Sequence, residues 1–251
     1  GGQYPPRYNR CAENERIIFA MDTVSVIIAA GGKAQRMEGV NKQLALLCGI
    51  PVIIRSMMIF QGMDEVAEII AAVRSEDRVI VTQLAEKYGI TKFAGCADGG
   101  ETRQKSVVNA LRTVSRDTTL IAVHDGARPL ADPDFIRQCI KDASVFGGAA
   151  LAVPVKDTIK QAEGGIVTDT PDRRKLYITQ TPQIFKKKLY FEGVNFAGDH
   201  DLDFTDDCQL VEAVGGKIHI TLSDYRNIKI TTPEDMAIAE AILNFSEKTE
   251  E

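Results

Sequence analysis

Short apolar runs alternate with stretches of helical periodicity from Met21 onward, and this alternation restricts the fold more than any other feature of the sequence. A strand–helix–strand order of this kind requires right-handed crossovers and gives a mostly parallel sheet. We therefore expect an α/β fold in which helices cover both faces of such a sheet. The predicted strands are Val24–Ala29, Ala67–Val73, Lys92–Cys96, Thr119–His124, Ala149–Pro154 and Lys217–Thr221. The predicted helices are Pro51–Gln61, Arg78–Tyr88, Ser106–Val114, Pro133–Phe146, Asp206–Val214 and Pro233–Asn244.

One segment interrupts the alternation and is typical of a β-hairpin that leaves the main sheet. Thr158–Lys160 and Ile166–Thr168 flank a Gly164-Gly165 turn. An isolated hairpin is marginally stable in water, so we expect it to pack on another surface, for which a second subunit is the obvious candidate. Residues 22–251 are then one domain with an arm at about 155–178. Residues 1–21 show neither helical nor strand periodicity, and we expect a vector-derived remnant or a disordered extension there.

The composition excludes some broad classes of function. A net charge of −5 argues against a general nucleic-acid or membrane-surface binder, since both usually carry a basic excess. No apolar stretch approaches the roughly 20 residues needed to span a bilayer. The 5 cysteines are scattered and form no CxxC pair, which favours reduced thiols in the cytoplasm over disulfides or a zinc site.

The stretch from Val24 to Gln43, VSVIIAAGGKAQRMEGVNKQ, is a buried strand that runs into a glycine loop followed by two cations. Gly31 and Gly32 allow the backbone to close on a phosphate, and Arg36 and Lys42 can neutralise it. The spacing fits neither the Walker loop nor the dinucleotide-binding loop. It indicates a nucleoside triphosphate bound in a less common way, although the segment alone would also fit an ordinary turn.

Asp125 stands at the tip of a predicted strand in AVHDGARP, where a carboxylate can hold Mg²⁺ together with substrate phosphates. The alternative is a carboxylate that caps the next turn. The neighbouring His124 has no Ser or Cys nucleophile motif to partner it, which favours a structural histidine.

Paired glycines in the segment Asp98–Leu111, DGGETRQKSVVNAL, precede a helix expected to begin near Ser106. Glycines permit close approach of the backbone to a planar base, and backbone amides with the Ser106 hydroxyl could read its polar edge. A loop with a helix cap is the alternative. Further along, Ile228 and Ile230 flank Lys229 and direct it to one side of an extended segment.

Eight motifs, in this order, resemble the family of 2-C-methyl-D-erythritol 4-phosphate cytidylyltransferases across Val24 to Leu243. They are AAGGKAQRM with NKQ, GGETRQKS, VHDGARP, VPVKDTIK, TPDR, TQTPQ, TDD and NIKITTPED. The resemblance implies a Rossmann-like core with a projecting β-arm that forms a homodimer. It also implies a reaction of CTP with methylerythritol phosphate that releases pyrophosphate and uses Mg²⁺.

The resemblance also implies roles for single residues. Asp125 would hold the metal, and Thr158 and Arg173 on the arm would reach the partner's site. The catalytic residues would be Arg36, Lys42, Arg173 and Lys229. Residues implied to line the nucleotide or contact its phosphates are Ala30, Gly31, Gly32, Arg36 and Lys42. Residues implied to recognise cytosine and its surroundings are Gly100, Glu101 and Ser106. Residues implied to face methylerythritol phosphate are Arg128, Thr181, Thr205 and Lys229.

Three positions depart from the family pattern and two other functions stay open. In the loop, Gly31 replaces an alanine and Ala34 replaces a glycine, and Asn41 replaces the proline before Lys42. None of these changes removes a charge that the chemistry needs. A ribitol-5-phosphate cytidylyltransferase would share the fold and the nucleotide chemistry, and a non-catalytic nucleotide-sensing module would share the fold alone. The retained cations argue against the sensing module.

Overall fold

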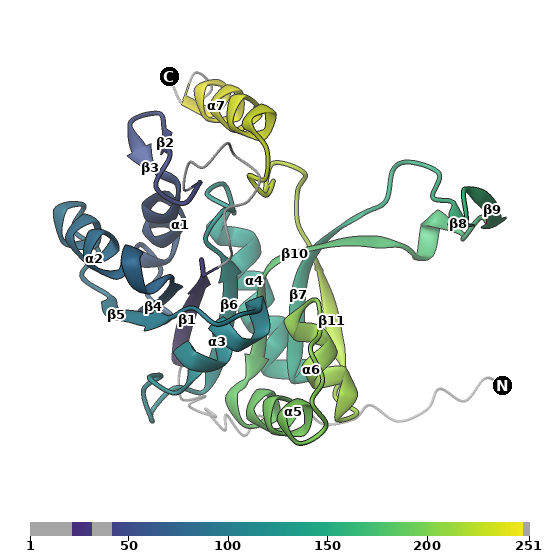
Figure 1. Cartoon of the computed structure of the whole chain (residues 1–251), viewed down its shortest axis with the longest axis horizontal. Helices are drawn as coiled ribbons and strands as arrows, with labels where there is room; N and C mark the ends of the chain where they lie inside the picture. Colours follow the sequence, from purple (N-terminus) through teal and green to yellow (C-terminus); the bar gives the residue numbers. More distant parts are fainter. Residues whose placement is uncertain (1–21, 32–41, 248–251) are drawn as a thin grey trace, which may run out of the picture.

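A seven-stranded sheet with the order β11-β7-β10-β6-β1-β4-β5 forms the centre of the computed structural model, which describes residues 22–31 and 42–247 (Figure 1). Only β10 runs antiparallel to its neighbours within this sheet. The mostly parallel α/β sheet predicted from the sequence is therefore confirmed. The strands are β1 (Val24–Ala29), β4 (Val66–Val73), β5 (Phe93–Asp98), β6 (Leu120–Asp125), β7 (Gly148–Pro154), β10 (Tyr177–Lys186) and β11 (Ile218–Leu222).

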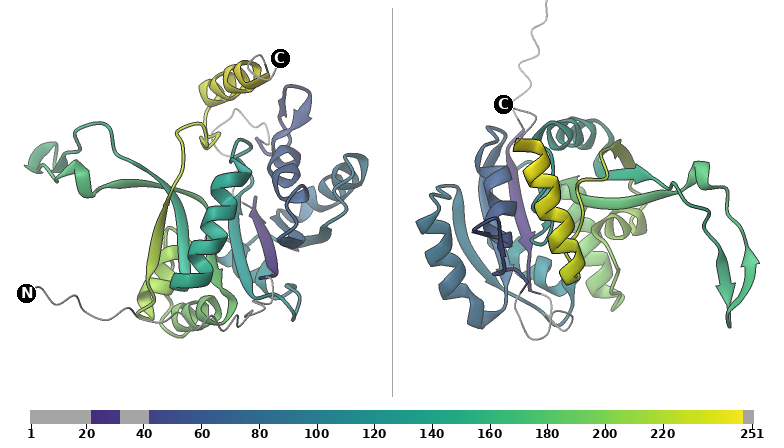
Figure 2. Two further views of the ribbon diagram at one scale, coloured as in Figure 1. Left: turned by 180° about the vertical axis from the view of Figure 1, so that it is seen from behind. Right: turned by 90° about the horizontal axis from the view of Figure 1, so that it is seen from above.

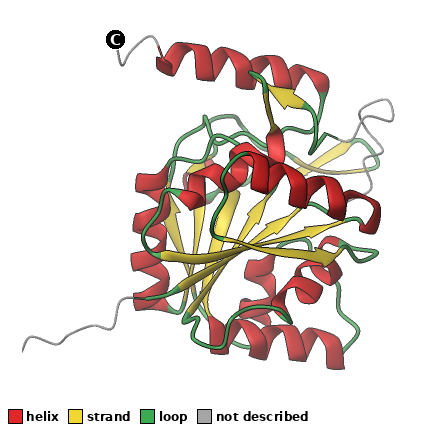
Figure 3. Cartoon of the chain, turned by 90° about the vertical axis from the view of Figure 1, so that its left-hand side faces the viewer, coloured by secondary structure: helices red, strands yellow, loops and turns green. Residues whose placement is uncertain are grey.

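Helices cover both faces of the sheet (Figure 3). One face packs on α1 (Val52–Gln61), α2 (Arg78–Lys87) and α4 (Pro133–Phe146). The other packs on α3 (Arg103–Leu111), α5 (Lys187–Asp199) and α6 (Asp207–Ala213). Successive side chains of β1 alternate between these cores, as the pleat requires: Val26 and Ile28 point to the first and Ile27 to the second. Among the described helices, none is long and apolar enough to cross a membrane.

A third, smaller core lies away from the two faces of the sheet. It joins α7 (Pro233–Glu247) to the small hairpin of β2 (Leu46–Leu47) and β3 (Ile50–Pro51) and to the loop after β6. Figure 1 shows α7 at the top of the molecule beside β2 and β3. The chain that leads into α7 therefore passes over the end of β6.

The predicted hairpin is present and projects from the sheet (Figure 2). Its strands are β8 (Gln161–Glu163) and β9 (Ile166–Asp169), joined by Gly164 and Gly165 with φ of +55° and +82°. Two successive positive φ angles are typical of the type I′ hairpin turn. The first strand lies three residues later than the predicted Thr158–Lys160, because pairing begins with Gln161 opposite Asp169.

Apart from the two-residue strands β2 and β3, the described elements that were not predicted as strand or helix include β10 and α5. The sequence of β10, YITQTPQIFK, is rich in polar residues, yet Gln180, Thr181 and Gln183 are buried and hydrogen-bonded in the sheet. The helix α5 opens on lysines and contains Gly193 and Gly198, which obscure its period. The sequence pattern failed at both places because tertiary contacts stabilise residues that are poor formers of the element.

The helix α3 begins at Arg103, three residues before the predicted start near Ser106. The Thr102 hydroxyl accepts a hydrogen bond from the Lys105 backbone N–H and caps the helix. The described part of the chain also contains two short 3₁₀ helices, η1 (Ser75–Asp77) and η2 (Arg173–Lys175).

Candidate active site

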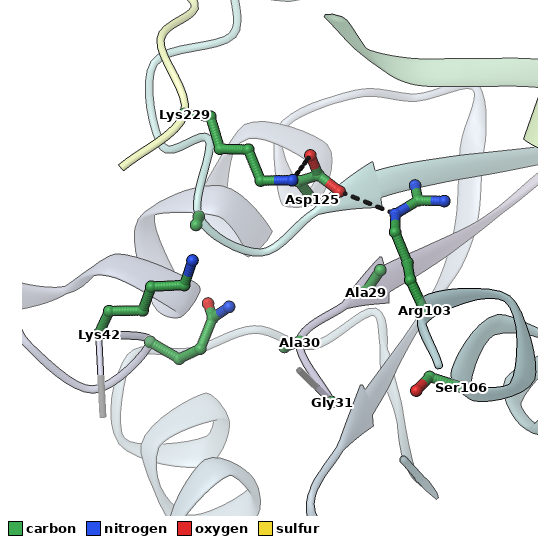
Figure 4. Close-up of a pocket in the computed structure, with 10 residues that line it drawn as sticks. Ala29, Ala30, Gly31, Lys42, Arg103, Ser106, Asp125 and Lys229 are labelled. Carbon is green, nitrogen blue, oxygen red and sulfur yellow. Dashed lines mark hydrogen bonds and ion pairs between the residues drawn. The ribbon is translucent and has the colours of Figure 1, made fainter. Parts of the chain in front are cut away.

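The candidate site lies where β1 and β6 end side by side. Ala29 and Asp125 are paired in the parallel register, and the Gly126 N–H donates to the Ala29 carbonyl at 3.0 Å. Ligands of open α/β sheets bind beyond the carboxyl ends of the strands, and a pocket of about 210 Å³ opens at this end (Figure 4). The residues that line it are Ala29, Ala30, Gly31, Lys42, Gln43, Arg103, Ser106, Asp125, Ala127 and Lys229.

Gly31 is the point at which the loop after β1 touches the loop after β5. A Cβ on Gly31 would lie 2.8 Å from the Ser106 Oγ and 2.9 Å from the Gly99 Cα. The Ala30 N–H, next to it, donates to the Ala72 carbonyl at 2.8 Å and fixes the start of the loop. A glycine is therefore required here by close approach of the two loops rather than by a positive φ.

Ser106 lines the pocket, but its hydroxyl is committed to the loop before α3. The Ser106 Oγ donates to the Thr102 carbonyl at 2.8 Å and accepts from the Gly100 N–H at 2.9 Å. With its one proton in use, the hydroxyl can accept a further hydrogen bond but cannot donate one. Ser106 and Gly100 thus shape the predicted base-binding loop.

Asp125 is buried at the end of β6 and lies within reach of three cationic side chains. Its Oδ2 lies 2.8 Å from Lys229 Nζ and 3.5 Å from Arg128 Nε, and its Oδ1 accepts from Arg103 Nε at 3.2 Å. Burial alone would raise the pKa of this carboxyl, but Arg103, Lys229 and Arg128 outweigh burial and hold the pKa well below its usual range. Asp125 is therefore ionised and gathers cations at the pocket.

Lys229 reaches the pocket from the extended segment before α7. Its neighbour Ile230 is fully buried, and the Ile230 N–H donates to the Ala127 carbonyl at 2.8 Å. The expected alternation therefore turns Lys229 toward the site. Figure 4 shows Lys229 and Lys42 entering the pocket from separate segments.

His124 and Thr181 form a buried link behind Asp125. The His124 Nε2 lies 2.9 Å from the Arg128 carbonyl, so this nitrogen carries the proton, and the Thr181 hydroxyl donates to Nδ1 across 3.1 Å. The Thr181 Oγ1 accepts from the Asp125 N–H at 3.0 Å. Burial lowers the pKa of His124 to about 4, so the ring is neutral near pH 7.

Arg128 supports the same corner of the site without lining the pocket. Its Nη1 donates to the Asn227 carbonyl at 2.7 Å, which ties the loop after β6 to the segment that carries Lys229. The contact of Arg128 and Thr181 with an acceptor substrate remains a prediction. Arg128 hydrogen-bonds to the protein through Nη1, and the Thr181 hydroxyl lies between His124 and the Asp125 N–H.

Glu101 and Thr205 lie outside the pocket. The exposed Glu101 carboxylate, which precedes α3, accepts from Lys105 Nζ at 2.9 Å. The Thr205 backbone N–H and hydroxyl both donate to the Gln209 Oε1, at 3.0 and 3.1 Å. These contacts make Thr205 part of the turn before α6.

Thr158 and Arg173 are exposed on the arm and do not line the pocket of their own chain. The Arg173 Nη1 donates to the Lys156 carbonyl at 2.7 Å across the base of the arm. Figure 2 shows the arm extending away from the sheet.

Part of the predicted phosphate loop lies outside the described residues. This applies to Gly32, Ala34, Arg36 and Asn41, and their predicted roles stay predictions. Lys42 follows directly, and it lines the pocket as the sequence leads one to expect.

Among the polar side chains that line the pocket, those of Arg103 and Gln43 were not predicted as site residues. Gln43 stands beside Lys42 in the NKQ motif, and Arg103 stands inside GGETRQKS. The misplaced start of α3 hid Arg103, because a first-turn position of a helix at the carboxyl edge of the sheet would have pointed it toward the strand ends.

Most of the chain is similar to proteins of one family. Residues 24–245 match the family described as IspD, 2-C-methyl-D-erythritol 4-phosphate cytidylyltransferase. A protein of that name from Caldanaerobacter subterraneus is 40% identical over 89% of this chain and 99% of its own length. One from Geobacillus kaustophilus is 41% identical over 86% of this chain and 95% of its own.

Solved structures agree. A 4-diphosphocytidyl-2C-methyl-D-erythritol synthase from Anaerococcus prevotii has a TM-score of 0.79 and 29% identity, covering 89% of this chain and 96% of its own. A 2-C-methyl-D-erythritol 4-phosphate cytidylyltransferase from Thermus thermophilus has a TM-score of 0.71 and 28% identity, covering 88% and 98%. With its Rossmann-like sheet and its cationic pocket at the strand ends, the chain belongs to the 2-C-methyl-D-erythritol 4-phosphate cytidylyltransferase family.

Proposed function

We propose that this chain joins CTP and 2-C-methyl-D-erythritol 4-phosphate to give the CDP-linked methylerythritol and pyrophosphate. The observation that carries the proposal is the set of cations at the ends of β1 and β6. Lys42, Arg103 and Lys229 line one pocket together with Asp125, the one carboxylate among the described residues that line it. Such an excess of positive charge suits a pocket that binds a nucleoside triphosphate next to the phosphate group of a second substrate.

The reaction needs no covalent intermediate on the enzyme. A phosphate oxygen of the acceptor attacks the α-phosphorus of CTP, and the bond from that phosphorus to the β-bridging oxygen breaks, so that pyrophosphate leaves with the electron pair. Catalysis then rests on positioning and on neutralising charge. Lys42, Arg103 and Lys229 supply the charge among the described residues, with Arg36 expected to add to it.

The pocket fits Mg²⁺ that is carried largely by substrate phosphates. The described residues contain no cluster of three or more metal-binding side chains, and Asp125 is the one carboxylate among those that line the pocket. Mg²⁺ is commonly held by one or two carboxylates, with phosphates and water supplying the other ligands. Asp125 would hold the ion, which would polarise the phosphates when bound.

The arm completes the site in a homodimer. Its strands bury little in their own chain: Ile166 is 74% exposed and Val167 is 54% exposed. A two-stranded hairpin with exposed apolar side chains calls for a partner surface, and a second copy offers one. Thr158 and Arg173 would then reach the acceptor end of the partner's pocket.

The cytoplasm is the compartment we propose for this reaction. The four cysteines in the described part of the chain, Cys48, Cys96, Cys139 and Cys208, are all free thiols. Free thiols persist in a reducing compartment.

A comparison of acceptors tests the function. Purified protein is incubated with CTP, Mg²⁺ and either methylerythritol phosphate or ribitol 5-phosphate, and pyrophosphate release is followed. We expect release with methylerythritol phosphate only. Turnover of ribitol 5-phosphate alone would assign the chain to the other acceptor, and nucleotide binding without turnover of either would favour a sensing module.

A further inference from the structure

The guanidinium of Arg103 joins the pocket to a second carboxylate behind it. Its Nε donates to the Asp125 Oδ1 at 3.2 Å, and its Nη1 donates to the Asp207 Oδ2 at 2.5 Å. Asp125 lines the pocket, whereas Asp207 does not. Arg103 therefore lies between one carboxylate that lines the pocket and one that is buried in the protein interior.

Asp207 is held from three elements of the fold. It is 1% exposed at the first turn of α6, and its Oδ1 accepts from the Tyr190 hydroxyl of α5 at 2.5 Å. Its backbone N–H donates to the Gln183 Oε1 of β10 at 3.0 Å. Tyr190 is itself fully buried and stacks on Phe185 with ring centroids 4.9 Å apart. The carboxylate of Asp207 is consequently fixed in space.

Burial and the neighbouring Asp207 raise the pKa of Tyr190 well above its ordinary value, so its hydroxyl stays protonated and donates. Ionised carboxylates are rarely buried this deeply unless they are paired, because desolvation is costly. Burying the ion pair of Asp207 and Arg103 has a desolvation cost that an apolar pair of similar volume would avoid. The pair therefore points to a role beyond stability.

The geometry of the guanidinium shows what the pair can do. A planar guanidinium that donates from two of its nitrogens to two different carboxylates is held in one orientation. The third nitrogen, Nη2, forms no hydrogen bond within the described residues, and the Arg103 side chain is 27% exposed where it lines the pocket. Figure 4 shows the guanidinium beside Asp125 at the edge of the pocket.

We propose that Asp207 and Tyr190 are positioning residues that hold Arg103 as a further cation for the nucleotide phosphates and keep Asp125 aligned. This inference rests on the proposed cytidylyl transfer, in which a phosphate chain occupies the pocket. Asp207 and Tyr190 touch neither the pocket nor a ligand, and they act through Arg103.

Two substitutions test the link. Asp207→Asn removes the charge that holds Nη1, and Tyr190→Phe removes only the hydroxyl and retains the stacked ring. We expect Asp207→Asn to lower kcat/KM for CTP by about tenfold to a hundredfold, since small displacements of a catalytic group have effects of this size. We expect about threefold to tenfold for Tyr190→Phe. Calorimetric binding of CTP without added metal should weaken in both variants.

Matched controls lie elsewhere in the fold. Asp142→Asn removes a carboxylate that accepts from Gln138 and Thr221, and Tyr225→Phe removes a hydroxyl that donates to the Pro154 carbonyl at 2.6 Å. Both should retain kcat/KM within about twofold, because they do not touch the network.

Combination with Arg103→Lys separates positioning from structural support. A lysine has one nitrogen and cannot hold both carboxylates as the fork does. If Asp207 acts through Arg103, the double variant Asp207→Asn with Arg103→Lys loses no more kcat/KM than Arg103→Lys alone. Losses that multiply would overturn the proposal. Wild-type kcat/KM and CTP affinity in Tyr190→Phe and Asp207→Asn would overturn it as well.

If Asp207→Asn does not fold, the same comparison is made with Tyr190→Phe, alone and combined with Arg103→Lys. If wild-type protein binds CTP but transfers it to no acceptor, the proposed function fails, and the CTP affinities of the variants still decide the positioning role.

Discussion

The pocket and the arm are built in opposite ways. At the pocket, Asp125 at the end of β6 meets Arg103, Arg128 and Lys229, and Asp207 supports Arg103 from behind. The arm has two short strands, β8 and β9, and every residue of these strands is exposed. A phosphate site needs fixed charges, so it is placed on rigid strand ends. The arm buries none of its strand residues in its own chain, and the proposed homodimer would supply the surface on which they pack.

Loss of Lys229 should have the largest effect and tests whether the pocket is the reaction site. Lys229→Ala removes a preorganised cation, whose contribution to the transition state is about 3 kcal/mol or a hundredfold in kcat. Steady-state pyrophosphate release measures kcat, and circular dichroism checks the fold. A wild-type kcat in this variant would show that the reaction does not take place in this pocket.

The buried, neutral His124 should make the free energy of unfolding decrease in acid, whereas the exposed arm should contribute no such pH dependence. His124 has a pKa of about 4 in the folded protein, against about 6.5 when unfolded. The unfolded chain binds more protons between these values, so stability is fully present above pH 6.5 and falls as pH falls toward 4. Urea unfolding should show a loss of about 2 kcal/mol between pH 7 and pH 5 from this group.

His124→Gln should remove that part of the pH dependence, although it will also lower the stability at pH 7. An equal slope in the variant and the wild type between pH 7 and pH 5 would show that His124 is not the group responsible. An exposed arm variant such as Thr158→Ala should keep the wild-type slope.

Mixing two inactive variants tests whether the arm serves the partner's pocket. Lys229→Ala and Arg173→Ala are each expected to be inactive as homodimers, but a mixed dimer has one site with both residues intact. Random exchange between two-fold symmetric dimers makes half of them mixed, so activity should recover to about one quarter of wild type. No recovery after subunit exchange, verified by native mass spectrometry, would place Arg173 and Lys229 in the same chain's site or on separate tasks.

Changes on the exposed strands of the arm should have the smallest effect on the fold. Ile166→Ser alters a side chain that is 74% exposed, so the free energy of unfolding of one chain should change by less than about 0.5 kcal/mol. Sedimentation at several concentrations should instead show weaker dimerisation. A large loss of monomer stability with unchanged self-association would contradict the role given to the arm.

Features with local signals could be predicted from the sequence. Asp125 ends a predicted strand, and Lys229 alternates with two isoleucines, so both were found, and both line the pocket. The strand β1 was predicted residue for residue, because apolar β-branched residues stop abruptly at glycine. The hairpin turn at Gly164 and Gly165 has an equally local cause.

Features that depend on distant contacts could not be predicted. Arg103 and Asp207 are 104 positions apart, and nothing local marks Asp207 as the partner of a pocket arginine. The strand β10 has a polar sequence that is satisfied only by bonds such as Thr181 to His124, 57 positions away. Its antiparallel insertion between β6 and β7 follows from the same long-range contacts.

Phosphorus NMR of the complete reaction tests the central claim most directly. Wild-type protein is incubated with CTP, methylerythritol phosphate and Mg²⁺. The pocket chemistry predicts equal amounts of pyrophosphate and a new diphosphate diester, with loss of the acceptor's monophosphate signal, and Lys229→Ala should slow both signals together. Orthophosphate release, or consumption of CTP with the acceptor signal unchanged, would contradict cytidylyl transfer at this site.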